Sequence, residues 1–176
     1  MWDMRPLLRL LPALIAISPL VTHAGEKKPA PVSIRVFCEG NEKEGESFVT
    51  PMELTNPPKK IFMRKVPVVT ERDINSFFPF PGNDGMVGAY FRLDAHGADK
   101  LDQFTTEDRG KLAVVVVNGR VAAAMRIEQR VKDGILYVPG GILPNEVALL
   151  ETKYPVIGRE SEFGKKPVQE KPAKQQ

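Results

Sequence analysis

Residues 112–127 read LAVVVVNGRVAAAMRI and contain the strongest folding signal in the chain. Leu112 to Val117 is an apolar run rich in β-branched residues, which is typical of a strand covered on both faces. Asn118-Gly119 separates it from a second run, Val121 to Ile127. An Asn-Gly pair between two such runs indicates a β-hairpin, because both turn residues must accept a positive φ. The stretch therefore predicts an antiparallel β-hairpin.

Further elements are predicted on both sides of this hairpin. A helix is expected to begin at Asp94 or His96 and to continue to about Glu107, with Leu101 and Phe104 on its apolar side. A closing helix begins with Pro144 in its first turn and extends to about Lys153. Strands are predicted at Val32–Val36, Phe48–Leu54 (an edge strand, since it contains a proline), Ile61–Val69, Val87–Leu93 and Ile135–Val138. Together they predict an α+β fold, a largely antiparallel sheet with two or three helices packed on one face.

The first residues have the pattern of a secretory signal peptide. Arg5 and Arg9 precede an apolar run, Leu10 to Val21, which ends at Thr22-His23-Ala24. An uncleaved membrane anchor fits less well, because two prolines interrupt a run that is shorter than the roughly 20 residues a spanning helix needs. We expect cleavage after Ala24, a periplasmic or secreted location, and no transmembrane segment after cleavage.

Composition divides the rest of the chain into three parts. Residues 25–31 form a polar linker, residues 32–157 a single domain, and residues 158–176 a Lys-, Glu- and Pro-rich tail that is expected to be disordered. The formal net charge of the whole chain is only +3. Basic and acidic residues balance within 25–157, so the composition argues against a nucleic-acid partner.

Few side chains suit catalysis. After signal cleavage the chain keeps one cysteine, Cys38, and one histidine, His96. They could act as a nucleophile and its base only if the fold joined two distant segments. Asp94 and His96 could be two metal ligands, but a tetrahedral zinc site needs three or four, and no partner cluster accompanies them. We therefore predict a non-enzymatic protein with no cofactor and no metal site, with an unrecognised hydrolase as the less favoured alternative.

Phe77, Phe78 and Phe80 are the clustered aromatic residues of the chain, within FFPFPGNDG at 77–85. The prolines and glycines predict a loop here. Two interpretations remain open: the three rings form an exposed peptide-binding patch, or they anchor the loop onto the core. Exposed apolar clusters are uncommon on soluble proteins, which favours the anchor.

The second half, from Val87 to about Leu150, resembles the head of the first periplasmic domain of the SecD and SecDF family, which are accessory subunits of the Sec translocon. The residues that carry the resemblance are Asp94-Ala95-His96-Gly97-Ala98, Thr105 to Lys111, Leu112 to Val117, Asn118-Gly119, Val121 to Met125, Val138 to Gly141 and Pro144 to Leu150. Two positions depart from the family pattern, with Asp108 in place of asparagine and Met125 in place of proline.

The resemblance implies the head's fold and its contact with unfolded polypeptide outside the membrane. It does not imply proton-driven transport, which depends on a transmembrane bundle. The expected partner is an unfolded polypeptide or an envelope protein. The alternative is a structural or interaction domain that is unrelated to protein export.

Overall fold

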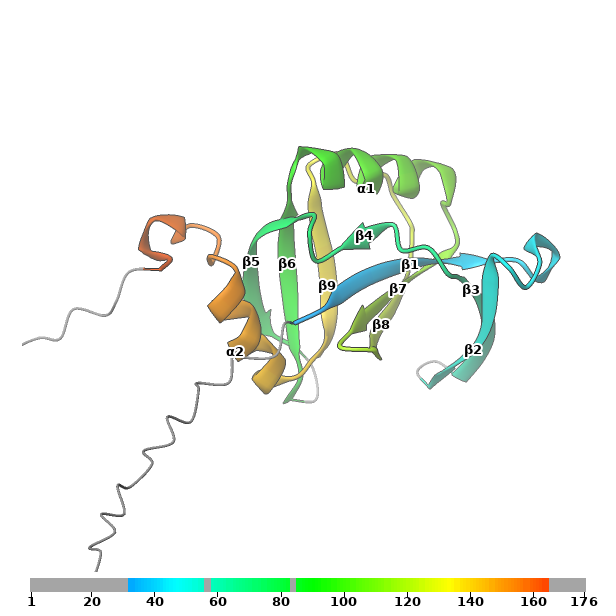
Figure 1. The fold of residues 1–176 in the computed structure, drawn as a ribbon, viewed down its shortest axis with the longest axis horizontal. Helices are drawn as coiled ribbons and strands as arrows, with labels where there is room; N and C mark the ends of the chain where they lie inside the picture. The colour runs from blue at the N-terminus through cyan, green and yellow to red at the C-terminus, as the bar shows by residue number, and fades with distance from the viewer. Residues whose placement is uncertain (1–31, 56–57, 83–84, 165–176) are drawn as a thin grey trace, which may run out of the picture.

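The computed structural model describes residues 32–55, 58–82 and 85–164 (Figure 1). The predicted signal peptide, residues 1–24, and the linker, residues 25–31, lie outside the described residues, as do residues 165–176 of the predicted tail. The first part of that tail, residues 158–164, is described and includes a 3₁₀ turn, η3, at Glu160–Glu162.

The strands form two antiparallel sheets instead of the single sheet that was predicted. The larger sheet has the order β2-β3-β1-β7-β8, with β4 also paired to β1, and the smaller has the order β5-β6-β9. The strands are β1 Ile34–Gly40, β2 Val49–Thr55, β3 Pro58–Arg64, β4 Val69–Thr70, β5 Ile74–Pro81, β6 Val87–Leu93, β7 Leu112–Val117, β8 Arg120–Arg126 and β9 Ile135–Ile142. Apolar residues of both sheets pack together in the main core, which explains why the chain needs two layers.

The predicted hairpin is confirmed. Strands β7 and β8 pair antiparallel with Val117 opposite Arg120, and the turn residues Asn118 and Gly119 have φ values of 49° and 80°. Strand β7 is also buried on both faces, as its apolar run predicts. Val115 and Val117 belong to the main core, whereas Val114 belongs to a second apolar cluster on the opposite face, beneath the β2–β3 hairpin.

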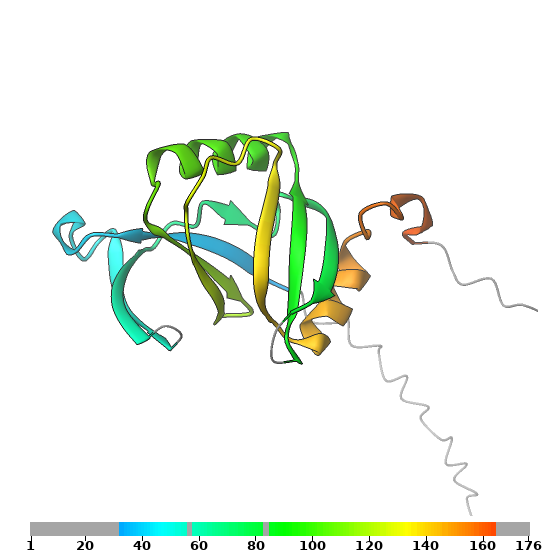
Figure 2. The same cartoon turned by 180° about the vertical axis from the view of Figure 1, so that it is seen from behind.

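The two predicted helices form near their expected bounds, but they do not share one face. Helix α1 spans Ala95–Glu107, and its N-cap Asp94 accepts a hydrogen bond from the Gly97 backbone N–H at 2.7 Å. Helix α2 spans Pro144–Lys153, with Pro144 at its first position. Figures 1 and 2 show α1 across one end of the two sheets and α2 beside β5.

The prolines and glycines of residues 77–85 predicted a loop, and this prediction is wrong for residues 77–81. Residues 74–81 form strand β5, which pairs antiparallel with β6 along its length. Proline cannot donate a backbone hydrogen bond, so it is tolerated in a strand where one side lacks a partner strand. Strand β5 has this position, at the end of the order β5-β6-β9.

Candidate functional site

The three phenylalanines of β5 divide between the two faces of the small sheet. Phe77 is fully buried, with 0% of its surface exposed, and its ring stacks on Phe91 of β6 at a centroid distance of 6.1 Å. Phe78, the next residue, points to the other face and is 46% exposed. Successive side chains of a strand alternate between faces, so one strand supplies both a core anchor and a surface residue. The assignment of Phe77 to a binding surface is therefore corrected to a core role.

Four aromatic rings gather on the outer face of the small sheet, and we call this surface the aromatic face: Phe78, Phe80, Tyr90 and Tyr137. Tyr90 of β6 lies between Phe78 and Tyr137 in the strand register. The Phe80 ring stacks on Tyr137 at 5.8 Å and lies 5.1 Å from Tyr90 between centroids. Tyr90 and Tyr137 remain 40% and 45% exposed.

Sequence reasoning missed the two tyrosines of this face. The available signal was alternation: Tyr90 stands between the apolar residues Ala89 and Phe91, both of which are buried. The same pattern places Tyr137 between Leu136 and Val138 on β9. Neither residue is near Phe78 in the chain, so only the strand register shows that they form one surface.

The chain itself covers the outer edge of β5 beside this face. The Phe77 N–H donates to the Pro155 carbonyl at 3.1 Å, and the Ile157 N–H donates to the Phe77 carbonyl at 2.8 Å. Further along, Glu160 pairs with Arg92 of β6 at 3.1 Å. A ligand at this end of the molecule would therefore meet the aromatic rings rather than the β5 edge.

A second feature is an apolar cavity between β8 and β9. It has a volume of about 390 Å³, and its walls include Leu101 and Phe104 of α1, Met125 of β8, and Leu136 and Tyr137 of β9. Tyr137 belongs to both the cavity and the aromatic face. The two features thus adjoin at one residue of β9.

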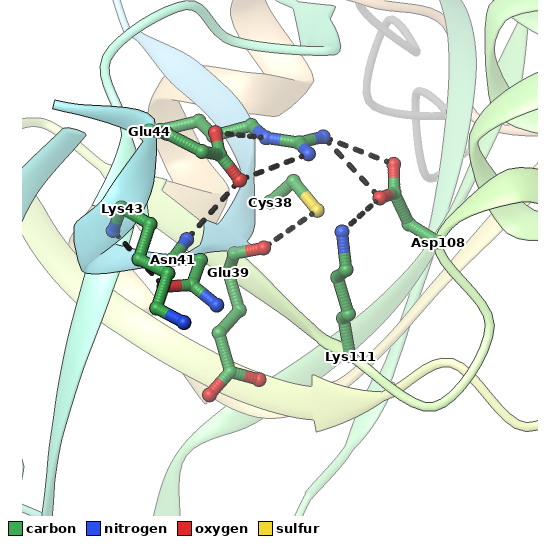
Figure 3. Close-up of polar contacts among 8 residues, drawn as sticks. Cys38, Glu39, Asn41, Lys43, Glu44, Asp108 and Lys111 are labelled. Atoms are coloured by element: carbon green, nitrogen blue, oxygen red, sulfur yellow. Dashed lines mark hydrogen bonds and ion pairs between the residues drawn. The ribbon is translucent and has the colours of Figure 1, made fainter. Parts of the chain in front are cut away.

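A cluster of charged side chains lies at the C-terminal end of α1, around Arg64 and Asp108 (Figure 3). The Arg64 guanidinium pairs with Glu44 at 3.0 Å and with Asp108 at 3.2 Å, and Lys111 Nζ donates to Asp108 at 2.6 Å. These contacts join the β2–β3 hairpin to the residue that ends α1. The Cys38 Sγ lies beside this cluster and donates to the Glu39 carbonyl at 3.1 Å.

The Cys38 thiol is unsuited to nucleophilic catalysis. Burial, reinforced by the negative charge of Asp108, raises the pKa of the Cys38 thiol to about 12. The thiol is therefore protonated at neutral pH, whereas the nucleophile of a cysteine enzyme is the thiolate. His96 stands in the first turn of α1, and Asp108 follows its last turn. A rise of 1.5 Å per residue separates these two positions by about 18 Å along the helix axis, so the Cys38–His96 pair is not assembled.

Replacement of Asp108 with asparagine is expected to destabilise the protein by about 1–2 kcal/mol at pH 7. Burial alone would raise the pKa of Asp108, but the Lys111 hydrogen bond and the Arg64 charge lower it below its ordinary value of 3.8. A carboxylate with a lowered folded-state pKa stabilises the fold above its ordinary pKa, and this stabilisation is lost as the pH falls through the lowered value. Urea unfolding at pH 7 and near pH 3 measures the effect.

The matched control for this prediction is Glu53→Gln, because Glu53 is an exposed acid on β2 with no ion pair among the described residues. Glu53→Gln should leave the free energy of unfolding within about 0.5 kcal/mol of the wild type. If Asp108→Asn is as stable as the wild type at pH 7, the polar cluster does not stabilise the fold.

The chain is similar to part of a translocase subunit. Over 127 residues it is 23% identical to the protein translocase subunit SecD of Aquifex aeolicus (strain VF5), a match that covers 70% of this chain and 25% of that protein. The chain therefore spans about a quarter of the length of this relative. No protein-family model matches the chain. The match confirms the predicted resemblance to SecD.

Two solved structures are also similar. One is described as "Structure and function of a membrane component SecDF that enhances protein export", with a TM-score of 0.47, 17% identity, and coverage of 68% of this chain and 61% of that one. The other, "Crystal structure of SecDF in Super-membrane-facing form", has the same TM-score and identity and covers 68% and 18% of the two chains. Within the described residues of the present chain, no helix has the length and apolar character needed to cross a membrane.

Proposed function

We propose that this chain is a periplasmic, non-enzymatic domain that binds extended polypeptide at its aromatic face, in an accessory role in protein export. The similarity to SecD, whose name is that of a protein translocase subunit, supports the link with export. The observation that carries the binding proposal is the aromatic face, where three of four clustered rings are at least 40% exposed. Large contiguous apolar patches are rare on the surfaces of soluble monomers, and where they occur they commonly mark an interaction site.

The residue types of this face fit a protein-binding surface. Tyr, Phe and Arg are enriched at interfaces, where a few such side chains supply most of the binding free energy. Arg92, on the same face of β6 as Tyr90, adds a partly exposed guanidinium. Aromatic rings pack against many apolar side chains, so this face suits clients of varied sequence. It also suits a patch on a folded envelope protein, which is the second candidate partner.

The proposal includes the domain organisation. Residues 32–157 act as one domain, residues 1–24 act as an export signal that is removed after Ala24, and the segment from 158 onwards is a tail. Mass spectrometry of the protein recovered from the envelope should give Gly25 as the first residue. Recovery of an intact Met1 in the membrane fraction would reject the signal-peptide part of the proposal.

The double variant Phe78→Ser/Tyr137→Ser tests the binding surface. Both side chains are about half exposed, so the variant should remain folded while it loses much of the apolar contact area. The probe is a fluorescein-labelled peptide of alternating leucine and serine, and binding is measured by fluorescence anisotropy. The wild type should bind it with a Kd between about 10 μM and 1 mM, and the variant about fivefold or more weakly.

The matched control is Phe48→Ser, because Phe48 is 65% exposed and lies outside the aromatic face. It should bind the probe as the wild type does. An equal loss in this control would show that the peptide adheres to any exposed aromatic ring. Absence of binding by the wild type at about 1 mM would reject polypeptide binding, and binding of a folded envelope protein alone would favour the second candidate.

A further inference from the structure

The cavity between β8 and β9 is an opening into the main core. Leu101, Phe104 and Leu136, which line it, are all buried residues of that core. Its size lies within the range of about 300–1,000 Å³ that is common for ligand sites. At one end the two strands close together, since a Cβ on Gly141 would lie 1.9 Å from the Ala122 carbonyl oxygen. Towards Met125 and Tyr137 the strands separate, and the cavity occupies the space between them.

Strand β9 presents unpaired backbone groups at this opening. Leu93 and Gly134 face each other across the β6–β9 ladder, and the Leu93 N–H donates to the Gly134 carbonyl at 3.0 Å. Hydrogen-bonded and non-hydrogen-bonded pairs alternate along an antiparallel ladder. Tyr137, which pairs with Tyr90, is therefore in a non-hydrogen-bonded pair, and its N–H and C=O point away from β6. Within the described residues, β9 is the last strand of the small sheet and pairs only with β6, so no strand lies along this edge.

The rim of the cavity has more positive than negative charge. Arg126 and Glu128 line the cavity, and Arg109 lies beside them because its Nε donates to the Glu128 carbonyl at 3.0 Å. Arg126 donates to the Gly110 carbonyl at 2.8 Å and forms no ion pair within 4 Å in the part of the chain that the structure describes. Burial alone would raise the pKa of Glu39, which is paired with Lys59 at 2.9 Å, but the charges of Lys59 and Arg126 help to lower it. The rim thus has two arginines and one glutamate, and the excess positive charge favours a ligand that carries an acidic group.

From these observations, and resting on the proposed function, we propose that the cavity is the anchor site for a short extended peptide that carries one large apolar side chain and an acidic residue two positions away from it. The peptide backbone pairs with the Tyr137 N–H and C=O at the β9 edge. Because neighbouring side chains of an extended chain point to opposite faces, the anchor enters the cavity while the next residue lies over the aromatic face. An acidic residue two positions from the anchor lies on the same side of the extended chain as the anchor and faces Arg126 and Arg109 at the cavity rim.

The test compares three fluorescein-labelled peptides in a serine-glycine background. The first has one leucine with an aspartate two positions away, the second has alanine in place of leucine, and the third has lysine in place of aspartate. By anisotropy, the second should bind about tenfold or more weakly than the first, because it lacks the buried anchor. The third should bind about two- to fivefold more weakly, and this difference should disappear at about 1 M salt.

Variants of the protein test the location. Met125→Trp fills the cavity and should weaken binding of the first peptide about tenfold. If Met125→Trp fails to fold, Gln129→Trp replaces it, because Gln129 lines the cavity from an exposed position. Gln129→Trp should weaken binding by the same factor. Phe48→Trp adds the same ring size at a distant exposed site and should have no effect. Arg126→Glu should reverse the preference for aspartate over lysine, whereas Lys60→Glu, on the exposed β3 strand, should not.

The outcomes separate this inference from the proposed function. If Phe78→Ser/Tyr137→Ser loses the probe peptide while the cavity variants bind all three peptides like the wild type, the anchor site is rejected and the aromatic face stands. If the alanine peptide binds as well as the leucine peptide, the anchor site is also rejected. Failure of every peptide to bind the wild type overturns both proposals.

Discussion

Replacement of Phe77 with alanine is expected to lower the free energy of unfolding by about 3–5 kcal/mol. Phe77 is fully buried, stacks on Phe91, and is among the largest side chains in the main core. Its removal loses the transfer free energy of a phenyl ring and leaves a cavity that the surrounding strands fill only partly. A loss of this size is a large part of the total stability of an ordinary domain, so the variant should unfold at much lower urea concentrations.

The control is the neighbouring residue. Phe78→Ala removes the same ring from a site that is 46% exposed, and its cost should stay below about 1 kcal/mol. The pair thus separates the two roles that adjacent phenylalanines have on one strand. Equal urea midpoints for Phe77→Ala and Phe78→Ala would contradict the burial of Phe77 and would reopen its assignment to the binding surface.

Replacement of Gly141 with alanine should cost about 3–5 kcal/mol. Gly141 has a φ of 85°, and an added Cβ would lie 1.9 Å from the Ala122 carbonyl oxygen of β8. The atom in the way belongs to the backbone, so the two strands would have to move apart. That movement would also affect the contacts of Arg120, which donates to the Gly141 carbonyl at 2.9 Å and pairs with Glu146 at 2.7 Å.

Gly119→Ala provides a matched comparison for this substitution. Gly119 has a similar φ of 80°, but an added Cβ there would meet no atom within 4 Å. This variant carries the backbone strain without the steric conflict, and it should cost about 1–2 kcal/mol. Thermal and urea unfolding of both variants measure the difference. If the two variants lose the same stability, the close approach of β8 and β9 is not a constraint on the fold.

Local sequence patterns determined the elements that depend on near neighbours. The Asn118-Gly119 turn, the start of α1 at its Asp94 cap and the start of α2 at Pro144 all agree with the structure. Each rests on backbone conformation or capping within a few residues, which the chain encodes directly. The same is true of β7, whose continuous apolar run indicates burial on both faces without naming its partners.

Strand β5 shows where local reasoning stops. Its prolines are unfavourable inside a sheet, and they predicted a loop in residues 77–85. They are tolerated because β5 occupies the end of the small sheet, where, among residues 32–55, 58–82 and 85–164, its outer side pairs only with the short segment around Val156. Position in a sheet depends on which strands pair, and pairing is set by packing between segments that are far apart in the chain.

The candidate binding surfaces were decided by tertiary structure alone. The sequence by itself identified Phe78 and Phe80 as unusual, and it identified the resemblance to SecD that the comparison supports. It could not show that Tyr90 and Tyr137 join them, because these residues come from three strands. The strand register places Phe78 opposite Tyr90 and brings the rings of Phe80, Tyr90 and Tyr137 within about 6 Å of one another. Nor could it show the cavity, which exists because β8 and β9 meet at Gly141 and separate towards Tyr137. Side-chain periodicity assigns a residue to a face, but only the pairing of distant strands determines which residues share that face.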